Sequence, residues 1–208
     1  MIPLPTSQVF VSEYRNHRIS VFTLEGQLLR AFGKAGNGDG EPRHPKGICL
    51  NPQGTELFVA DCLSSQVQVL SPDGIFLRAW GAGQLLVSRD VKVSALEVFV
   101  SDLGNHRVCV FRPDGTLLRV LGKGEGDGDG QLRIPTGLAL TAHRTVLVCD
   151  ESNHRVQELR ASDGAFVRKW GKHGHGEGEL KHPCGVAVSD KGEVFVCDSN
   201  HHKVQVFV

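Results

Sequence analysis

Carboxylate and basic side chains recur at one fixed spacing in this sequence. An acidic residue stands two positions after an apolar triplet five times, at Glu13, Asp61, Asp102, Asp150 and Asp198. Five positions further on, the chain has Arg18, Arg107, Arg155 and Lys203, and Gln66 in the second case. A carboxylate at a strand end can accept hydrogen bonds from turn amides, and an arginine can pair with it across a hairpin. Because catalysis needs one distinctive set of groups, repeated copies of this pair indicate a structural device.

Three glycine-rich segments invite a phosphate-binding or calcium-binding interpretation. A phosphate loop needs Gly-Lys-Ser/Thr at the start of a helix, and the sequence offers neither. Glu125, Asp127 and Asp129 resemble the start of an EF-hand loop, but its twelfth position falls on Thr136 instead of a bidentate glutamate. We therefore interpret these segments as connectors and expect no cofactor in them.

Histidine and cysteine side chains are common metal ligands and nucleophiles. His173, His175 and His182 lie in one segment near Cys184, but their spacing fits no familiar zinc motif. Cys149 and Cys197 occupy a repeat position that elsewhere holds serine or alanine, which indicates a small, tightly packed residue. No Ser/His/Asp arrangement stands apart from the repeats, so we expect no metal and no catalytic residue.

The spacing of the acidic residues predicts the architecture. Their intervals are 48, 41, 48 and 48 residues, and each interval holds four short β-type runs separated by turn residues. In the second copy we predict strands a, b, c and d at 47–50, 57–60, 66–70 and 75–80. Four-stranded sheets that recur every 40–50 residues are typical of a β-propeller, so the expected fold is all-β. The approximate repeats are 1–33, 34–81, 82–122, 123–171 and 172–208, within a single domain 1–208.

The repeated unit resembles the NHL repeat over essentially the whole chain. The resemblance rests on Asn16-His17-Arg18, Asn105-His106-Arg107 and Asn153-His154-Arg155, each followed by an Asp-Gly or Glu-Gly turn. It implies a β-propeller, usually of six blades. NHL domains of the tripartite-motif family and of malin recruit protein substrates to a RING-type ubiquitin ligase, and other members of the family bind single-stranded RNA. The propeller of the peptidyl-hydroxyglycine amidating lyase, a metal enzyme, is a third relative.

Strand counting departs from the usual family pattern. The first copy supplies strands b, c and d, three copies are complete, and the last supplies a, b and c, which gives 18 strands. Both ends would supply strands b and c, so the termini do not complement each other. We therefore predict about five blades, the first and last incomplete, as an open arc, a strained closure or a fragment of a six-bladed propeller.

Binding is expected where the long d–a loops and the b–c turns lie, because successive turns of an antiparallel meander alternate between the two ends of the strands. The candidate binding residues are Arg18, Lys34, Arg43, His44, Arg107, Lys123, Arg133, Arg155, Lys172, His173, His175 and Lys181. The residues expected to form the structural repeat motif are Glu13, Asn16, His17, Asp61, Asp102, Asn105, His106, Asp150, Asn153, His154 and Asp198.

Charge favours a protein partner over RNA. The chain has 23 basic and 23 acidic residues, and loops 33–44, 122–134 and 171–182 hold six basic against seven acidic residues. An RNA-binding face would be strongly positive and would offer aromatic rings. We therefore expect a non-enzymatic scaffold for protein partners, the recognition part of a ubiquitin-ligase system without a RING domain of its own. RNA binding is the first alternative, and an amidating-lyase-like enzyme is the second.

The same sequence features suggest a cellular location. No basic segment followed by an apolar stretch opens the chain, and the apolar runs are too short to cross a bilayer. The six cysteines form no CxxC pair and are expected to be reduced. We therefore expect a cytoplasmic protein that does not bind membranes.

Overall fold

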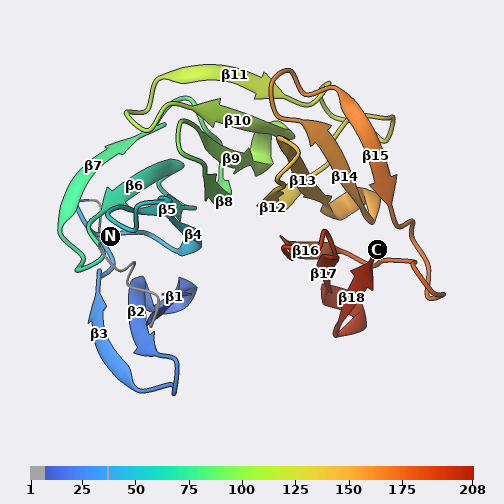
Figure 1. The fold of residues 1–208 in the computed structure, drawn as a ribbon. Helices are drawn as coiled ribbons and strands as arrows, with labels where there is room; N and C mark the ends of the chain where they lie inside the picture. Colours follow the sequence, from blue (N-terminus) through green and yellow to red (C-terminus); the bar gives the residue numbers. More distant parts are fainter. Residues whose placement is uncertain (1–7, 37) are drawn as a thin grey trace. The chain divides into compact units, whose positions relative to one another are not determined.

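The computed structural model describes residues 8–36 and 38–208. Within them it contains eighteen β-strands and four three-residue 3-10 helices, and the strands form five antiparallel sheets (Figure 1). The predictions of an all-β fold and of a β-propeller with incomplete first and last sheets are confirmed, down to the strand count.

The strands follow one another in each sheet without crossovers. The first sheet holds β1 (Gln8–Glu13), β2 (Arg18–Thr23) and β3 (Leu28–Phe32). The second holds β4 (Pro45–Leu50), β5 (Leu57–Asp61), β6 (Gln66–Leu70) and β7 (Phe76–Trp80). The third holds β8 (Ser88–Val93), β9 (Val98–Asp102), β10 (Arg107–Phe111) and β11 (Leu117–Leu121). The fourth holds β12 (Pro135–Leu140), β13 (Thr145–Asp150), β14 (Arg155–Arg160) and β15 (Phe166–Trp170). The fifth holds β16 (Pro183–Val188), β17 (Val194–Asp198) and β18 (Lys203–Phe207).

The chain divides into two compact units within the third sheet. One comprises the described residues up to Val98 together with Arg112–Gly115, and the other comprises Phe99–Phe111 and Thr116–Val208. The expectations of a single domain and of an open or strained arc concern how these units combine, and they stay predictions.

Apolar strands are buried because sheets pack face to face within each unit. In the second unit, Leu147 and Cys149 of β13 pack with Val156 against Val194 and Val196 of the fifth sheet. In the first unit, Ile19 of β2 packs against residues of the second sheet. In the second, third and fourth sheets the apolar triplets therefore belong to strands buried on both faces, as predicted. In the first and fifth sheets one face of the triplet strand stays exposed, at Val9, Val11 and Phe195.

The glycines of two Pro-x-Gly motifs, Gly47 and Gly137, allow neighbouring sheets to approach closely. A Cβ atom on Gly137 of β12 would lie 2.7 Å from the Cys184 carbonyl oxygen and from the Gly185 Cα of β16. A Cβ atom on Gly47 of β4 would lie 2.5 Å from the Cα of Asp90 in β8. Both distances are shorter than real Cβ contacts, so these strands require glycine at the crossing point.

The b–c turns have a local structure that the sequence analysis did not predict. Four of them contain a 3-10 turn, at Tyr14–Asn16, Leu103–Asn105, Glu151–Asn153 and Ser199–His201. The next residue is left-handed, with φ of 54° at His17, His106, His154 and His202 and 51° at Ser65 in the second sheet. A left-handed non-glycine residue is uncommon, so its side chain needs a specific stabilising contact.

Candidate functional site

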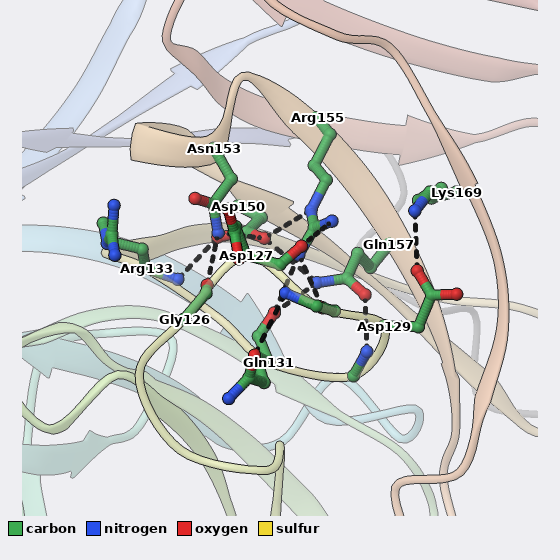
Figure 2. Close-up of polar contacts among 12 residues, drawn as sticks. Gly126, Asp127, Asp129, Gln131, Arg133, Asp150, Asn153, Arg155, Gln157 and Lys169 are labelled. Carbon is green, nitrogen blue, oxygen red and sulfur yellow. Dashed lines mark hydrogen bonds and ion pairs between the residues drawn. The ribbon is translucent and has the colours of Figure 1, made fainter.

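In the second to fifth sheets the b–c turn lies at the same end of the sheet as the d–a loop that leads into its first strand, and we call this the loop end. In the first sheet the loop end is the end that carries the b–c turn Tyr14–Asn16. In the fourth sheet the turn is anchored by Asp150, which is fully buried. Its carboxylate accepts hydrogen bonds from the backbone N–H of Arg133 at 2.6 Å, from Asn153 Nδ2 at 2.9 Å and from Gln157 Nε2 at 3.0 Å (Figure 2). Arg155 Nε donates a further bond at 2.8 Å. A buried charge is tolerated when it is paired and fully hydrogen-bonded in this way.

Arg155 links this anchor to the long loop at 122–134. Its Nη1 donates to the Asp127 carbonyl oxygen at 2.7 Å, and its Nη2 donates to the carbonyl oxygens of Gly128 and Gln131 at 2.9 and 3.0 Å (Figure 2). Only 7% of its side chain is exposed. The guanidinium therefore supplies the positive charge and the donors that fix the loop, and its fork reaches several acceptors at once.

The acidic residue has a similar role in the other sheets. Asp61 accepts from the Arg43 N–H at 2.8 Å and from Gln68 Nε2 at 2.9 Å, while Gln66 is 3.5 Å away. In the first sheet Glu13 accepts from Asn16, Arg18 and Ser20. In the third sheet Asp102 accepts from Asn105 Nδ2 and Arg107 Nε at 2.8 Å each. The predicted acid–base pairing within the repeat is thus present for Glu13–Arg18, Asp102–Arg107 and Asp150–Arg155.

The fifth sheet differs from the prediction. Asp198 pairs with His201 Nδ1 at 2.8 Å. Lys203 lies opposite Asp198 in the strand ladder, but among the described residues no ion pair joins the two side chains, so the expected ion pair was wrong. Lys203 is exposed, whereas the histidine of the 3-10 turn points back at the carboxylate. Burial opposes ionisation of Asp198, but hydrogen bonds from the Lys181 N–H, His201 and Gln205 outweigh it and lower the pKa of Asp198.

The histidine of each Asn-His-Arg motif joins consecutive repeats. The Nδ1 atoms of His17, His106 and His154 accept hydrogen bonds at 3.1–3.2 Å from the backbone N–H of residues 44, 134 and 182. Each donor belongs to the loop that leads into the following sheet. In the second sheet Ser65 Oγ accepts from the Val87 N–H at 3.1 Å, so a serine performs the same task there. The left-handed conformation of these residues is thus accompanied by a specific contact, since each side chain accepts a hydrogen bond from the loop that leads into the next sheet.

Histidine rings of the second unit lie close together in two groups. In the second unit the ring of His154 lies 4.5 Å from that of His173 and 4.6 Å from that of His182, and His201 Nε2 lies 3.1 Å from His175 Nδ1. Burial, followed by the charges of nearby basic groups, lowers the pKa of His154. Across residues 8–36 and 38–208, no three His, Cys, Asp or Glu side chains are arranged to hold a metal ion.

The predicted binding residues fall into three classes of exposure. Arg18, Lys34, Arg43, Lys123, Arg133, Lys172, His173 and His175 are exposed. His44, Arg107 and Lys181 are half-buried, and Arg155 is buried. The loops 122–134 and 171–182 place several of the exposed residues at loop ends of the second unit, and the loop 33–44 does so in the first. Arg155 supports the loop 122–134, and with 7% of its side chain exposed it offers little surface to a partner.

Several loop charges are paired with an opposite charge of the same loop or of a neighbouring strand. Lys34 pairs with Glu41 at 3.0 Å, and Lys172 pairs with Glu179 at 3.2 Å. Lys34 and the Gly38 N–H lower the pKa of Glu41, while the Gly176 N–H and Lys172 lower that of Glu179. Asp129 of the loop 122–134 pairs with Lys169 at 2.6 Å (Figure 2). The three loops therefore carry little net charge, with six basic and seven acidic residues.

The thiols show no activated nucleophile at the loop ends. All six cysteines lie in the described part of the chain, and none forms a disulfide. Burial raises the pKa of Cys109 to about 12, which keeps this thiol protonated at neutral pH. Cys149 is fully buried, as predicted for a tightly packed position, but the equivalent Cys197 is exposed, because no described sheet covers that face of β17.

These features define a class of protein: a β-propeller whose loop ends are anchored by repeated carboxylates. The solved structures that it resembles are propellers too. A chain of the nidogen/laminin complex superposes with a TM-score of 0.78 at 18% identity, over 98% of this chain and 72% of that one. The virginiamycin B lyase of Staphylococcus aureus gives 0.71 at 13% identity, over 99% of this chain and 65% of that one. Such low identities show the fold alone.

Sequence comparison identifies the repeat. The family model of the NHL repeat matches residues 132–159 and 180–207. The brain tumor protein of Drosophila melanogaster is 28% identical over 88 residues, which cover 42% of this chain and 8% of that protein. The lin-41 protein of Caenorhabditis elegans is 38% identical over 63 residues, which cover 30% of this chain and 5% of that protein. The chain thus carries NHL repeats, and it spans less than a tenth of the curated relatives that it matches.

Each described helix has three residues, and none is long and apolar enough to cross a membrane.

Proposed function

We propose that this chain is a non-enzymatic binding scaffold that presents its loop ends to a protein partner. Its resemblance to the NHL domains of tripartite-motif proteins and of malin supports a more specific role, the recognition of protein substrates for a ubiquitin ligase. In that role the chain binds and positions the substrate in the cytoplasm, and another polypeptide segment supplies the catalytic step.

The anchoring of the loops is the observation that carries the proposal. Arg155 and Asp150 fix the loop 122–134 through buried hydrogen bonds, while Lys123 and Arg133 of the same loop stay exposed. A loop that is already ordered loses little conformational entropy when it binds, which favours specific recognition. The buried scaffold is repeated, whereas the exposed residues differ between loops, so each loop can contribute its own specificity.

The charge distribution supports protein over RNA as the partner. RNA binding depends on unpaired basic groups that neutralise phosphates, yet Lys34, Lys172 and Lys169 are already paired with carboxylates. The ring of Tyr14 is stacked on His44 at 4.2 Å and lies 4.4 Å from Lys46 Nζ. This ring is thus engaged in local packing, although stacking on bases would require it to be free.

Affinity capture with charge-reversed variants tests the proposal. The loop-end variant carries Lys123→Glu and Arg133→Glu. The matched control carries Arg144→Glu and Lys191→Glu, two exposed residues in the a–b turns at the other end of the fourth and fifth sheets. Each protein is used to capture partners from cell lysate with and without ribonuclease, and both must give the wild-type circular dichroism spectrum.

We expect the wild type and the control to retain the same proteins after ribonuclease treatment, and the loop-end variant to lose them. Recovery of a ubiquitin ligase or its substrates supports the more specific role. Loss of all captured proteins on ribonuclease treatment contradicts a protein partner and favours RNA. Equal capture by both variants contradicts recognition through this loop.

A further inference from the structure

Two histidine side chains from different segments face each other at the loop end of the fifth sheet. His201 belongs to the 3-10 turn Ser199–His201, and His175 belongs to the loop 171–182. His201 Nε2 lies 3.1 Å from His175 Nδ1, and the centres of the two rings are 4.9 Å apart. The pair therefore joins the b–c turn to the loop that leads into the same sheet.

Both histidines stand at positions where other repeats have different residues. The position of His201 holds an asparagine in three other repeats, at Asn16, Asn105 and Asn153. Counted back from the proline that begins the next strand, the position of His175 holds Asp127 in the fourth loop and Asn37 in the first. The two departures from the repeat occur in the same sheet. They bring together two side chains that transition metals favour as ligands.

A buried carboxylate fixes the ring of His201. Asp198 Oδ2 lies 2.8 Å from His201 Nδ1, and Asp198 is fully buried. The Lys181 N–H and Gln205 Nε2 also donate to this carboxylate, at 2.8 and 2.7 Å. Because an ionised carboxylate only accepts hydrogen bonds, Nδ1 of His201 carries the proton, and Nε2 of the neutral ring has a lone pair to donate. Histidines that bind metals are oriented in this way, by a carboxylate on the other ring nitrogen.

The distance between the two nitrogen atoms is suited to a shared metal ion. Zn–N bonds are about 2.0–2.1 Å long, so two nitrogen ligands of a tetrahedral zinc ion lie about 3.3–3.4 Å apart. The observed separation of 3.1 Å is slightly shorter than that value. His175 is exposed and lies between two glycines, Gly174 and Gly176, so this segment can adjust to turn the ring toward an ion.

The fifth sheet also lacks the cation that holds the loop of the fourth sheet. There Arg155 pairs with the buried carboxylate and donates to three carbonyl oxygens of the loop 122–134. The equivalent residue of the fifth sheet, Lys203, is exposed and has no guanidinium fork. Among the described residues, the one ion-pair partner of Asp198 is His201, which is charged only when protonated. A cation bound to His201 would therefore replace the charge that Arg155 supplies.

We propose that His175 and His201 bind a zinc ion, which links the loop 171–182 to the b–c turn of the fifth sheet. Imidazole nitrogen is a preferred ligand of Zn²⁺, whereas Mg²⁺ prefers oxygen. The chain supplies two ligands, because no third His, Cys, Asp or Glu of the described residues is placed to complete the site. Water fills the other coordination positions in the isolated chain. The site needs no partner, so it does not depend on the proposed function.

Isothermal titration calorimetry of the full chain with zinc chloride, in a buffer that does not chelate zinc, measures the binding. The test variants are His175→Asn and His201→Asn, which introduce the asparagine that stands at these positions elsewhere in the chain. His143→Asn, at an exposed histidine in a turn of the same unit, is the matched control. His173→Asn removes a ring of the other histidine group. Magnesium chloride tests the preference for nitrogen ligands, and hydrogen exchange of the amides in 171–182 reports whether the ion fixes the loop.

We expect Zn²⁺, but not Mg²⁺, to bind the wild type, His143→Asn and His173→Asn alike, and to slow exchange in the loop. His175→Asn and His201→Asn should each weaken zinc binding by at least about 10-fold, since even a residue that only orients a ligand contributes 10–100-fold. Both variants must keep the wild-type circular dichroism spectrum. Absence of zinc binding to the wild type, binding that both variants retain, or binding that is lost only in His173→Asn would overturn the proposal.

Discussion

Arg155 should contribute more to stability than any exposed arginine of the same repeat position, because it is the buried link between the turn and the loop of the fourth sheet. Its replacement by glutamine, the residue that the second repeat has at this position, removes the bond to Asp150 and the donors to three loop carbonyl oxygens. Glutamine is shorter and neutral, so it cannot reach the loop carbonyls and pair with the carboxylate at the same time.

The expected loss follows from these contacts. Breaking a buried ion pair costs about 3–5 kcal/mol, because a charge is left without its partner. Asp150 keeps the hydrogen bonds from the Arg133 N–H, Asn153 and Gln157, so the lower end applies. We expect Arg155→Gln to reduce the free energy of unfolding by about 3 kcal/mol. With a urea dependence of about 2 kcal/mol/M, the unfolding midpoint falls by about 1.5 M.

Urea denaturation and amide hydrogen exchange measure the effect. Arg18→Gln is the matched control, since Arg18 makes the equivalent pair with Glu13 at 2.8 Å but its side chain is 44% exposed. An exposed pair contributes about 0–1 kcal/mol, so this variant should shift the midpoint little. Exchange should accelerate across 122–134 in Arg155→Gln alone. A loss below about 1 kcal/mol, or one equal to that of Arg18→Gln, would refute the argument that burial makes Arg155 the main support of the loop.

Four further predictions concern single residues. Gly137→Ala should lower stability by about 1–3 kcal/mol because its Cβ meets the fifth sheet at 2.7 Å, whereas Gly185→Ala, with 3.4 Å of space, should change the unfolding midpoint little. His154→Ala should destabilise more than His154→Ser, since serine accepts the equivalent hydrogen bond in the second repeat. Burial lowers the pKa of His154, so the unfolded chain binds the proton more tightly than the folded chain. The contribution of His154 to stability should therefore be complete above pH 6.5 and fall as the pH is lowered below that value. Urea titrations at several pH values should show a smaller fall for His154→Ser than for the wild type. Thiol labelling should modify the exposed Cys197 first and leave Cys109 unmodified in the folded chain.

The fold was predictable because the repeat period and the strand pattern agree. The acidic residue, the turn glycine and the apolar triplet keep one spacing, and each strand of the second sheet begins and ends within about two residues of the predicted limits. The strand count followed from the same pattern. The arrangement of the two units relative to each other was not predictable, because the sequence pattern of a single repeat carries no information about it.

The candidate site was predictable only in part. The positions of the loops and the acid–arginine pairing follow from sequence spacing, but the burial of Arg155 does not, because Arg18 has the same motif and is exposed. The bond from His154 to the next loop was also missed. A signal for it exists in the sequence: the second repeat has serine where the four others have histidine, and both side chains can accept a hydrogen bond.

Hydrogen exchange of the chain alone and in complex with its captured protein partner tests the central claim most directly, because it locates the contact surface. We predict slower exchange at loop ends, in loops such as 122–134 and 171–182, and unchanged exchange in the a–b and c–d turns at 141–145, 161–165 and 189–193. Protection confined to those turns, with the loops unaffected, would contradict recognition through the anchored loops.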